Sequence, residues 1–367
     1  AQLSRGLGDV YKRQIMLKAK EMNVTPEELI KDIHEKHHQT FKNFNVKLAN
    51  FHSTHSDENK HLTSEIFRNA IKNKYIHKKE ISQLYDEKEQ IFLADRFVKG
   101  SCPACGAEEQ YGDACEKCGS TYDALELKNP ISVLSNTAPV VKESEHYFFK
   151  LNVFNAYLKE NVQKISNQTP IKAKLDEWLN EDLRDWDVSR DEPYFGFNVP
   201  GEGSKYIYVW MDAPVGYLSS IQNWANQNDI EYTDLMNEDN VKLVHFIGKD
   251  IVYFHLLFWP AMLKTYGINN LDEVFVHGFL TIEGSKMSKS KGNFILADKA
   301  LTFAQPDYYR YYLCSKLNTD ISDIDFSVND FVQKINSDLI GKFINIGSRT
   351  QNFLVKLNSS KVCLLYT

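Results

Sequence analysis

The stretch that decides the fold runs from residue 241 to residue 282 and reads VKLVHFIGKDIVYFHLLFWPAMLKTYGINNLDEVFVHGFLTI. Apolar and β-branched residues dominate positions 241–247, which predicts a buried strand that ends at the turn Gly248-Lys249-Asp250. Residues 251–265 predict a helix, and residues 274–282 predict the next strand. A strand, a helix and a second strand form a right-handed βαβ unit, so the stretch predicts a parallel sheet.

The same pattern occurs just upstream. Residues 205–211 are aromatic and β-branched and predict another strand, which ends at Asp212-Ala213-Pro214 and precedes a helical run to Ala225. Ligands of parallel α/β sheets bind beyond the carboxyl ends of the strands. We therefore expect a ligand near the turns at Asp212 and Asp250.

Three more helices are predicted outside this region. Thr25, Pro26 and Glu28 have the spacing of a capping box with proline at the first helical position. A second helix covers about residues 58–73, and a third begins near residue 331. The apolar stripe expected to face inward on the first helix is Leu29, Ile30, Ile33, His37, Phe41 and Phe44, and that of the last is Ile335, Leu339, Phe343 and Ile346.

The composition is that of a folded chain with two or three domains. There are 367 residues, of which 43% are hydrophobic and 25% charged, and these averages exclude a disordered, collagen-like or coiled-coil protein. The net charge of −6 means that a nucleic acid would have to meet local basic patches. No apolar stretch reaches the roughly 20 residues of a membrane helix, so we expect no membrane partner.

Four of the six cysteines form two close pairs. Cys102, Cys105, Cys115 and Cys118 give the pattern C-x2-C…C-x2-C, with a glycine after each pair. Four thiolates at this spacing suit one tetrahedral Zn²⁺ ion and leave no open position for water, which predicts one structural zinc per chain. The alternative is four unconnected buried thiols. Reduced, metal-binding cysteines favour a cytoplasmic location.

A second metal pattern is expected to be a false match. Residues 34–38 read HEKHH and satisfy H-E-x-x-H, the zinc-protease signature, in which the two histidines bind zinc and the glutamate is the base. Here His37, and not Glu35, falls on the predicted apolar stripe, and no third ligand is evident downstream. We interpret these residues as a solvated helix face.

The most informative loop is GSKMSKSKGN at residues 284–293. It places lysines and hydroxyl groups between two glycines directly after a predicted strand. Lysines are compact charges for a polyphosphate, serines donate hydrogen bonds, and the glycines allow a loop to close and reopen. A solvated basic loop is the alternative that composition leaves open.

The order of residues in this loop identifies a family. Lys286-Met287-Ser288-Lys289-Ser290 matches the KMSKS signature of class I aminoacyl-tRNA synthetases. The cysteine knuckle and the segments DRFVKG (95–100), WDVSRDEPYF (186–195), YIYVWMDAPVGY (206–217) and HFIGKDIVYFHLLFWP (245–260) resemble methionyl-tRNA synthetases, and the resemblance runs from about Ile15 to about Leu357.

The resemblance implies an activity and its participants. In this family, ATP with Mg²⁺ and methionine form methionyl-adenylate and pyrophosphate, and the methionyl group then passes to tRNA(Met). Lys286 and Lys289 would be the catalytic residues that bind the pyrophosphate portion in the transition state. The expected ATP site is Gly248, Asp250, Lys286, Ser288 and Lys289.

The resemblance also implies two recognition sites. A flexible thioether gains dispersion and sulfur–aromatic contacts among aromatic rings. The expected methionine site is Trp210, Ala213, Pro214, Tyr217, Ile251, Phe254, His255, Phe258 and Trp259. Asn345 and Arg349 match residues that read the tRNA anticodon, and their spacing of four places them on one helix face. Without the resemblance, the aromatics would be read as core and Asn345 with Arg349 as a surface polar pair.

The chain also departs from the family pattern. The family begins with a strand and a HIGH signature whose histidines and backbone amides stabilise the ATP phosphates, and neither precedes Ile15 here. No other histidine takes this role, since His52 and His55 belong to a different matching segment. We therefore expect this chain alone to activate methionine poorly or not at all. Near-normal methionine-dependent ATP–pyrophosphate exchange would contradict that expectation.

The predicted fold class is α/β: an incomplete Rossmann-type catalytic domain with a parallel sheet and a zinc-knuckle insertion, followed by the start of an α-helical bundle. The predicted parts are a segment outside the family pattern (1–14), the two halves of the catalytic domain (15–72 and 189–282), the insertion with its knuckle at 102–118 (73–188), the KMSKS and stem-contact region (283–342) and the start of the anticodon-binding domain (343–367).

Two alternatives remain beside methionine–tRNA ligase. One is another KMSKS synthetase of class I, against which Trp210, Phe258 and Trp259 argue. The other is a noncatalytic zinc-knuckle protein that binds RNA, which requires a strongly basic face near the knuckle. The acidic net charge and the two expected βα turns disfavour it.

Overall fold

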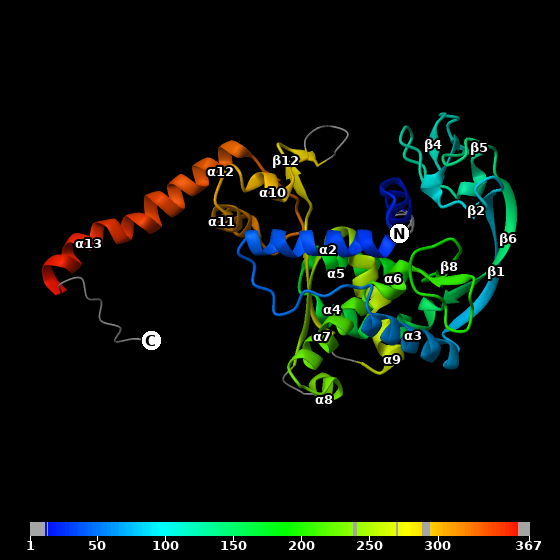
Figure 1. The fold of residues 1–367 in the computed structure, drawn as a ribbon, viewed down its shortest axis with the longest axis horizontal. Helices are drawn as coiled ribbons and strands as arrows, with labels where there is room; N and C mark the ends of the chain where they lie inside the picture. Colours follow the sequence, from blue (N-terminus) through cyan, green and yellow to red (C-terminus); the bar gives the residue numbers. More distant parts are fainter. Residues whose placement is uncertain (1–11, 13, 238–240, 269–270, 288–293, 359–367) are drawn as a thin grey trace. The chain divides into compact units, whose positions relative to one another are not determined.

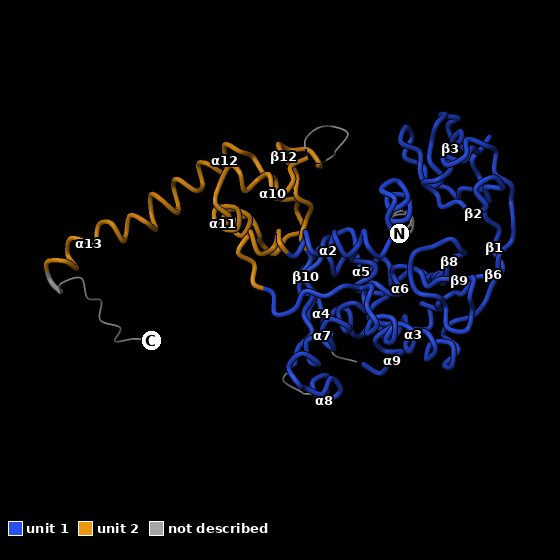
Figure 2. Tube along the Cα trace, viewed as in Figure 1, with its two compact units in different colours: residues 1–38, 48–276 blue, residues 39–47, 277–367 orange. Residues whose placement is uncertain are grey.

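The computed structural model describes residues 12, 14–237, 241–268, 271–287 and 294–358. The chain divides into two compact units, which Figure 2 distinguishes by colour. The first unit comprises residues 1–38 and 48–276, and the second comprises residues 39–47 and 277–367. No helix in the described ranges is both long and apolar enough to span a membrane.

The first helices confirm the predicted starts and correct the predicted inward face. Helix α2 (Pro26–Asn43) begins at the expected capping box, in which Glu28 N donates to Thr25 Oγ1 (3.1 Å) and Thr25 N donates to Glu28 Oε2 (2.9 Å). Leu29 is buried, but Ile33, His37 and Phe41 are exposed, so the expected stripe is wrong at these three positions. His34 and His38 make the inward contact instead.

The rings of His34 and His38 stack on Phe51, with centroid separations of 4.5 and 5.0 Å. Because Phe51 lies in the loop after α2, helical periodicity alone could not show which side of α2 it covers. The following helix α3 (Asp57–Lys72) agrees with the prediction and starts at Ser56, whose side chain accepts from Asn59 N.

A long hairpin carries the insertion (Figure 1). Strands β1 (Ile76–Asp86) and β6 (Val140–Phe149) pair antiparallel over ten residue pairs, from Ile76 with Phe149 to Tyr85 with Val140. With β2 (Ile91–Phe92) and β7 (Trp186–Asp187) they form a sheet of order β2-β1-β6-β7. Between β6 and β7 lie η3 (Leu151–Phe154), α4 (Asn155–Ile165) and α5 (Thr169–Asn180).

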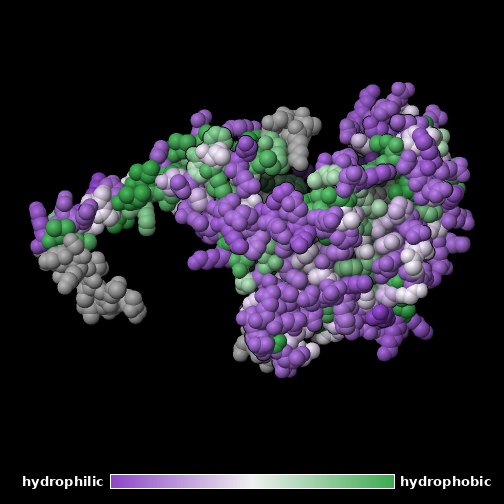
Figure 3. Space-filling model, viewed as in Figure 1, coloured by the Kyte–Doolittle hydropathy of each residue, from purple (hydrophilic) through white to green (hydrophobic). Residues whose placement is uncertain are grey.

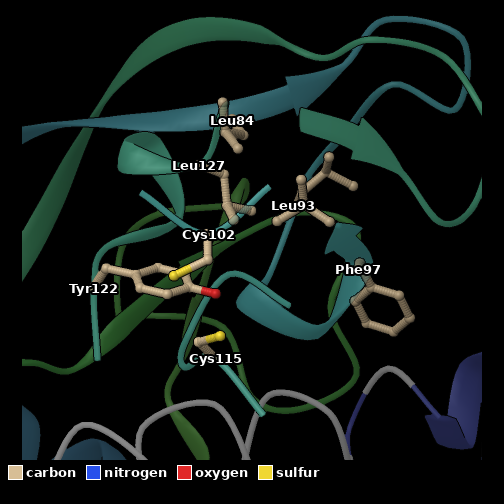
Figure 4. Close-up of a cluster of buried hydrophobic side chains, with 8 residues drawn as sticks. Leu84, Leu93, Phe97, Cys102, Cys115, Tyr122 and Leu127 are labelled. Atoms are coloured by element: carbon tan, nitrogen blue, oxygen red, sulfur yellow. The ribbon is translucent and has the colours of Figure 1, made fainter. Parts of the chain in front are cut away.

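The cysteine module forms between β1 and β6. Its three-stranded sheet has the order β4-β3-β5, with β3 (Val98–Ser101), β4 (Gln110–Tyr111) and β5 (Lys128–Ser132), and it includes the short helices η1 (Asp95–Phe97) and η2 (Ala124–Glu126). Figure 4 shows its small core, in which Cys102, Cys115 and Tyr122 lie below the leucines. The members of this core are Leu84, Leu93, Phe97, Val98, Cys102, Cys115, Tyr122 and Leu127.

The segment expected to form a strand at residues 205–211 is only partly a strand. Strand β9 (Lys205–Ile207) is short and pairs antiparallel with β8 (Ser189–Asp191), and the chain then turns into helix α6 (Val209–Asp212). Met211 N donates to Tyr208 O (2.8 Å), so the backbone begins to coil just after Ile207. Asp212 therefore ends a helical turn instead of a parallel strand. Helices α7 (Val215–Gln227) and α8 (Tyr232–Asn237) follow.

Residues 241–282 contain the predicted strand, helix and strand, but these elements begin and end at other residues than predicted. Strand β10 (Leu243–Gly248) leads through η4 (Lys249–Ile251), the π-helix η5 (Phe254–Phe258) and α9 (Trp259–Tyr266) to β11 (Leu271–His277). Strands β10 and β11 pair in a two-stranded sheet within the described residues.

The strand expected at residues 274–282 breaks at Gly278. A Cβ atom there would lie 2.0 Å from Ser322 O, so the chain passes too close to its neighbour for a side chain. After the break, β12 (Leu280–Ile282) pairs in parallel with β14 (Ile324–Phe326) and antiparallel with β13 (Ser285–Lys286) in the second unit.

The second unit is otherwise helical. Its core is formed by Tyr309, Tyr312, Phe331 and Ile335. The predicted helix near residue 331 is present as a longer succession that begins at Val328, and Figure 3 shows apolar side chains along it. Ile335 is buried as expected, but Phe343 and Ile346 are exposed, so the predicted inward stripe is wrong at these two positions. The helices are α10 (Ala297–Ala300), α11 (Pro306–Lys316), α12 (Val328–Lys334), the π-helix η6 (Ile335–Ile344) and α13 (Asn345–Asn358).

Candidate functional site

The predicted methionine residues gather around one stacked pair of rings. Trp210 on α6 lies on Phe254 of η5 with a centroid separation of 3.9 Å and an interplanar angle of 9°. Trp186 on β7 packs behind η5, 5.0 Å from Phe254 and 5.5 Å from Phe258. Three segments far apart in the sequence therefore form one aromatic cluster.

The π-helix explains why so many rings fit on one side. In η5 the amide of Trp259 donates to the carbonyl of Phe254, five residues earlier. The wider turn alters the register between the residues before and after it, and such turns often occur at functional sites. Phe254, Phe258 and Trp259 are all fully buried.

Two neutral histidines line the same cluster. Nδ1 of His255 lies 3.0 Å from Ile251 O, a carbonyl that can only accept, so Nδ1 carries the proton. With burial lowering the pKa of His255, Nε2 is free to accept from the hydroxyl of Tyr217 at 2.9 Å. Burial and then the neighbouring His255 lower the pKa of His245 to about 3. The indole of Trp259 donates to His245 Nε2 (3.3 Å).

The remaining predicted pocket residues, Ala213 and Pro214, join α6 to α7. Just before them, Asp212 is buried, and burial raises the pKa of its carboxyl group although Lys12 opposes this effect. Lys12 Nζ lies 3.0 Å from Asp212 Oδ2. The amide of Asn59 on α3 donates to Asp212 O (3.2 Å) and to Thr54 O (2.7 Å), which fixes this corner of the cluster.

The predicted nucleotide turn follows β10. Gly248 is the last residue of the strand and caps η4, while the carboxylate of Asp250 is exposed. Asp250 therefore lies where a ribose could reach it, one turn before the aromatic residues of η5. Gly248, Asp250 and the predicted methionine residues all belong to the first unit.

The four cysteines form a site that fits a tetrahedral ion. Their sulfur atoms lie within 4.8 Å of one another, with 3.8 Å between Cys102 and Cys118 and 3.6 Å between Cys105 and Cys115. A zinc–sulfur distance of about 2.3 Å implies a tetrahedral edge of about 3.8 Å. The donor set and its spacing therefore fit zinc.

The two halves of the knuckle have the same construction. The amides of Cys105 and Cys118 donate to Cys102 Sγ (3.5 Å) and Cys115 Sγ (3.4 Å). The following glycines have φ of 71° and 75°, which a residue with a Cβ rarely adopts. The hydrogen bond between Cys118 and Ser120 lowers the pKa of Cys118 to about 6, which favours a thiolate ligand.

The H-E-x-x-H match does not form a metal site. Among the described residues, the cysteines are the one group of three or more potential ligands that converge. His34 and His38 face Phe51 instead of a shared ion. These two histidines are half-buried, so they do not belong to the solvated helix face that was predicted.

The KMSKS region begins in a tight hairpin. Glu283 and Gly284 have φ of 48° and 73° and connect β12 to β13, as a two-residue hairpin turn requires. Asp325 Oδ1 accepts from Gly284 N (2.8 Å) and from Thr281 Oγ1 (2.7 Å). Lys286 is exposed on β13, with Nζ 4.6 Å from the ring centroid of Phe279. Ser288 and Lys289 lie outside the described residues.

The predicted anticodon pair lies on α13 of the second unit. Asn345 is half-buried and donates to Gly341 O (3.2 Å), while Arg349 is exposed four residues later. The two side chains therefore share one face of the helix, as predicted.

Sequence analysis missed three residues that complete the aromatic cluster: Trp186, His245 and Phe149. Phe149 on β6 meets the ring of Phe258 edge-on at 5.3 Å. Trp186 and His245 occur within the segments that resemble the family, and that was the available signal. Trp186 is positioned by the pairing of β7 with β6, which residue spacing alone does not reveal.

Comparisons with known proteins agree on one family. Residues 6–351 match the family described as tRNA synthetases class I (M). A methionine–tRNA ligase of Vesicomyosocius okutanii subsp. Calyptogena okutanii (strain HA) is 50% identical over 349 residues, which cover 95% of this chain and 64% of the relative. The chain thus spans somewhat less than two thirds of that relative's length.

Two solved structures share the fold. A Mycobacterium tuberculosis methionyl-tRNA synthetase in complex with methionyl-adenylate has a TM-score of 0.72 at 23% identity, covering 95% of this chain and 63% of that one. The free form of the Mycobacterium tuberculosis enzyme has a TM-score of 0.65 at 21% identity, covering 91% of this chain and 60% of the other.

Proposed function

Because the chain belongs to the methionyl-tRNA synthetase family of class I tRNA synthetases, we propose that it serves methionine–tRNA ligation. ATP and methionine would form methionyl-adenylate and pyrophosphate, and the methionyl group would pass to the terminal adenosine of tRNA(Met). The observation that carries this proposal is the aromatic cluster in which Trp210, Phe254 and Tyr217 meet two neutral histidines.

The cluster has the chemistry of a thioether pocket. Trp210 and Phe254 supply polarizable ring faces, with which sulfur makes favourable contacts. The hydroxyl of Tyr217 is already bonded to His255, whose lowered pKa keeps it neutral, so no charge repels an apolar side chain. The pocket we propose for methionine comprises Trp210, Ala213, Pro214, Tyr217, Ile251, Phe254, His255, Phe258 and Trp259.

ATP would bind with Mg²⁺ at the turn after β10 and at the KMSKS loop. Asp250 is exposed and suits the ribose hydroxyls, and Gly248 lets the backbone approach the nucleotide. Lys286 and Lys289 would stabilise the charge that develops on the pyrophosphate as it leaves, and Ser288 would donate a hydrogen bond. These interactions gain strength in the transition state, which is why the two lysines are the proposed catalytic residues.

The knuckle and the last helix have supporting roles in this proposal. Zinc held by Cys102, Cys105, Cys115 and Cys118 would stabilise the module without taking part in the reaction, because four sulfurs fill its coordination sphere. Asn345 and Arg349 would contact unstacked anticodon bases. We assign residues 15–72 and 189–282 to the catalytic domain, 73–188 to the insertion, 283–342 to the KMSKS region and 343–367 to the anticodon-binding domain.

A stable analogue of the reaction intermediate tests the proposal without requiring turnover. Methionyl sulfamoyl adenosine should bind the full chain at one site and at least about 100-fold more tightly than methionine, as intermediate analogues do. The leucyl analogue is the matched control and should bind far more weakly. Equal affinity for the two analogues would indicate a different synthetase, and no binding of either would contradict the proposed function.

A further inference from the structure

A buried histidine outside the aromatic cluster holds two carboxylates at once. His146 on β6 has a side chain that is 1% exposed. Its Nδ1 lies 2.8 Å from Asp187 Oδ2, and its Nε2 lies 2.9 Å from Asp191 Oδ2. Carboxylate oxygens can only accept, so both ring nitrogens donate and the ring is an imidazolium.

The charges around this ring favour its protonated form. The two negative charges beside the ring are those of Asp187 on β7 and Asp191 on β8. Each carboxylate also has a positive partner: Arg190 contacts Asp187, and Lys205 contacts Asp191. Lys79 on β1 is its partner in the strand register. Burial alone would lower the pKa of His146, but its hydrogen bonds to the two carboxylates outweigh burial and raise that pKa above the ordinary value.

Two uncharged groups complete the contacts near the ring. Gln83 Nε2 on β1 lies 3.0 Å from His146 Nε2 and 3.4 Å from Asp191 Oδ2. Because an amide nitrogen only donates, Gln83 beside an imidazolium must turn its amide so that the oxygen faces the ring. The hydroxyl of Ser144 donates to Asp191 Oδ1 at 3.0 Å. Asp191 therefore collects several donors, and hydrogen bonds of this kind hold its pKa well below the ordinary value although burial opposes them.

The two carboxylates are the ends of one short segment, residues 187–191. Between them, Val188 N donates to Tyr147 O (2.8 Å) and Tyr147 N donates to Ser189 Oγ (2.9 Å), so this segment is bonded to β6. On its other side, Tyr208 N donates to Val188 O (2.9 Å). The segment thus links the insertion to Tyr208, the residue directly before α6.

Both ends of this link reach the aromatic cluster. Trp186 directly precedes Asp187 and packs on Phe254 and Phe258. Tyr208 directly precedes α6, which carries Trp210. The stacked pair of Trp210 and Phe254 therefore rests on a segment whose two ends are fixed by one imidazolium.

We propose that His146 is a positioning residue for the pocket: its imidazolium grips Asp187 and Asp191 and thereby fixes Trp186 and Trp210 against Phe254. It contacts none of the proposed pocket residues and acts through the segment 187–191. The role in methionine binding rests on the proposed function, whereas the positioning of the two tryptophans does not.

Fluorine NMR of the full chain labelled with 5-fluorotryptophan tests the positioning itself. The chain has five tryptophans, and single Trp→Phe variants assign their signals. In H146Q, which is neutral and cannot grip both carboxylates, the signals of Trp186 and Trp210 should shift or broaden while that of Trp224 on α7 stays in place. The matched control is H77Q, because His77 lies on the same hairpin and contacts Asp185 (3.5 Å) while partly exposed.

A pH titration of the unsubstituted chain gives a second readout that is independent of how well H146Q folds. As the pH rises through the raised pKa of His146, the ring loses its proton and one of its two carboxylate contacts, so the Trp186 signal should move at a pH above the ordinary histidine value of about 6.5. H77Q should retain this titration and H146Q should abolish it. If the Trp186 and Trp210 signals neither respond to H146Q nor titrate in the unsubstituted chain, His146 does not position them.

Methionine titrations separate this inference from the proposed function. H146Q should raise the Kd for methionine about 10-fold, since small displacements of a binding surface are costly, and H77Q should leave it within about twofold. Failure of the unsubstituted chain to bind methionine would count against the proposed function, and the fluorine signals would still decide the role of His146. Unchanged affinity in H146Q with shifted tryptophan signals would overturn the link between positioning and binding.

Discussion

The cysteine knuckle and the aromatic cluster are held together in different ways. The four sulfurs of the knuckle come from residues 102–118, and amides within three residues of each buried cysteine point at its sulfur. The aromatic cluster takes its rings from segments far apart in the chain, between Phe149 on β6 and Trp259 at the start of α9. Its parts meet because the hairpin β1–β6, through Phe149 and the segment after Trp186, packs against η5.

The difference has physical consequences. A site formed by residues close in sequence loses little chain entropy when it assembles, so its stability depends mostly on its ligand. A site formed by distant segments depends on the packing of all the elements around it. The knuckle should therefore fail locally when its metal or one sulfur is lost. The aromatic cluster should respond to changes at residues that never touch it, such as His146.

Loss of a buried sulfur should have the largest effect. C102S removes one of the four proposed zinc ligands, so the chain should purify with less than about a tenth of its zinc. Cys102 is also part of the small core of the module, so the packing there is disturbed as well. Zinc content by mass spectrometry and hydrogen exchange across residues 95–132 measure the outcome. C314S is the control, because Cys314 is exposed and outside the cluster. Full zinc content in C102S would show that the four sulfurs are not its ligands.

Substitution of the stacked indole should come next. W210A removes the ring that lies 3.9 Å from Phe254, and the loss of an aromatic wall should raise the Kd for methionine about 100-fold. Zinc content should not change, since the knuckle is assembled separately. Titrations followed by tryptophan fluorescence give the affinity, with W224A on α7 as the control. An affinity for methionine unaffected by W210A would mean that methionine does not bind on this ring.

The two buried histidines of the aromatic cluster predict that the free energy of unfolding falls at acid pH, a part of the pH profile called the acid limb here. His245 and His255 are buried and neutral with lowered pKa values, so below the ordinary pKa of about 6.5 the unfolded chain binds more protons than the folded one. The free energy of unfolding should fall as the pH drops from about 6.5 towards 3, by up to about 1.4 kcal/mol per pH unit for each such group. Urea unfolding at a series of pH values measures this slope.

The same measurement separates these histidines from His146. A raised pKa contributes stability that is complete below about pH 6.5 and is lost as the pH rises through the folded-state value, so His146 acts on the alkaline side. H245Q should flatten the acid limb alone and H146Q the alkaline limb alone. H61Q, at an exposed position on α3, should change neither. An acid limb of the same slope in H245Q would refute the assignment of a buried neutral ring.

The smallest expected effect is at a glycine of the knuckle. Gly119 has φ of 75° and no atom within 4 Å of a built Cβ, so G119A meets backbone strain but no clash and should cost about 1 kcal/mol. Thermal unfolding of the zinc-loaded chain measures the change. G203A is the control, because its Cβ also meets open space without a positive φ. A Tm for G119A equal to that of the unsubstituted chain would show that the left-handed turn is not required.

The same contrast explains what could be predicted from sequence. The knuckle, the capping box of α2 and the turn at Gly248 follow from residues within a few positions of each other, and the structure has each of them. The strand predicted at residues 205–211 ends at Ile207, where its pairing with β8 ends, and the chain then coils into α6. The prediction that His37 faces inward is wrong because helical periodicity shows which residues share a face, but not which face a neighbouring segment covers. Here Phe51 covers the face of His34 and His38.

The aromatic cluster marks the limit of such prediction. Its aromatic residues have ordinary helical spacing and would be read as core without the resemblance to a family. His146 carries no sequence signal, and Trp186 has only its place in a segment that resembles the family, since their contacts form only when β6, β7 and η5 meet. The contacts that organise this site have high sequence separation, and residue patterns do not record them.

The central claim is that the cluster around Trp210 and Phe254 binds the methionine side chain. Calorimetric titration of the full chain with methionine tests it most directly, with leucine as the competitor that lacks sulfur. The account predicts one saturable site for methionine and an affinity for leucine at least about 10-fold weaker, because the thioether gains contacts with both rings. Equal affinities for the two amino acids, or no binding of methionine, would contradict it.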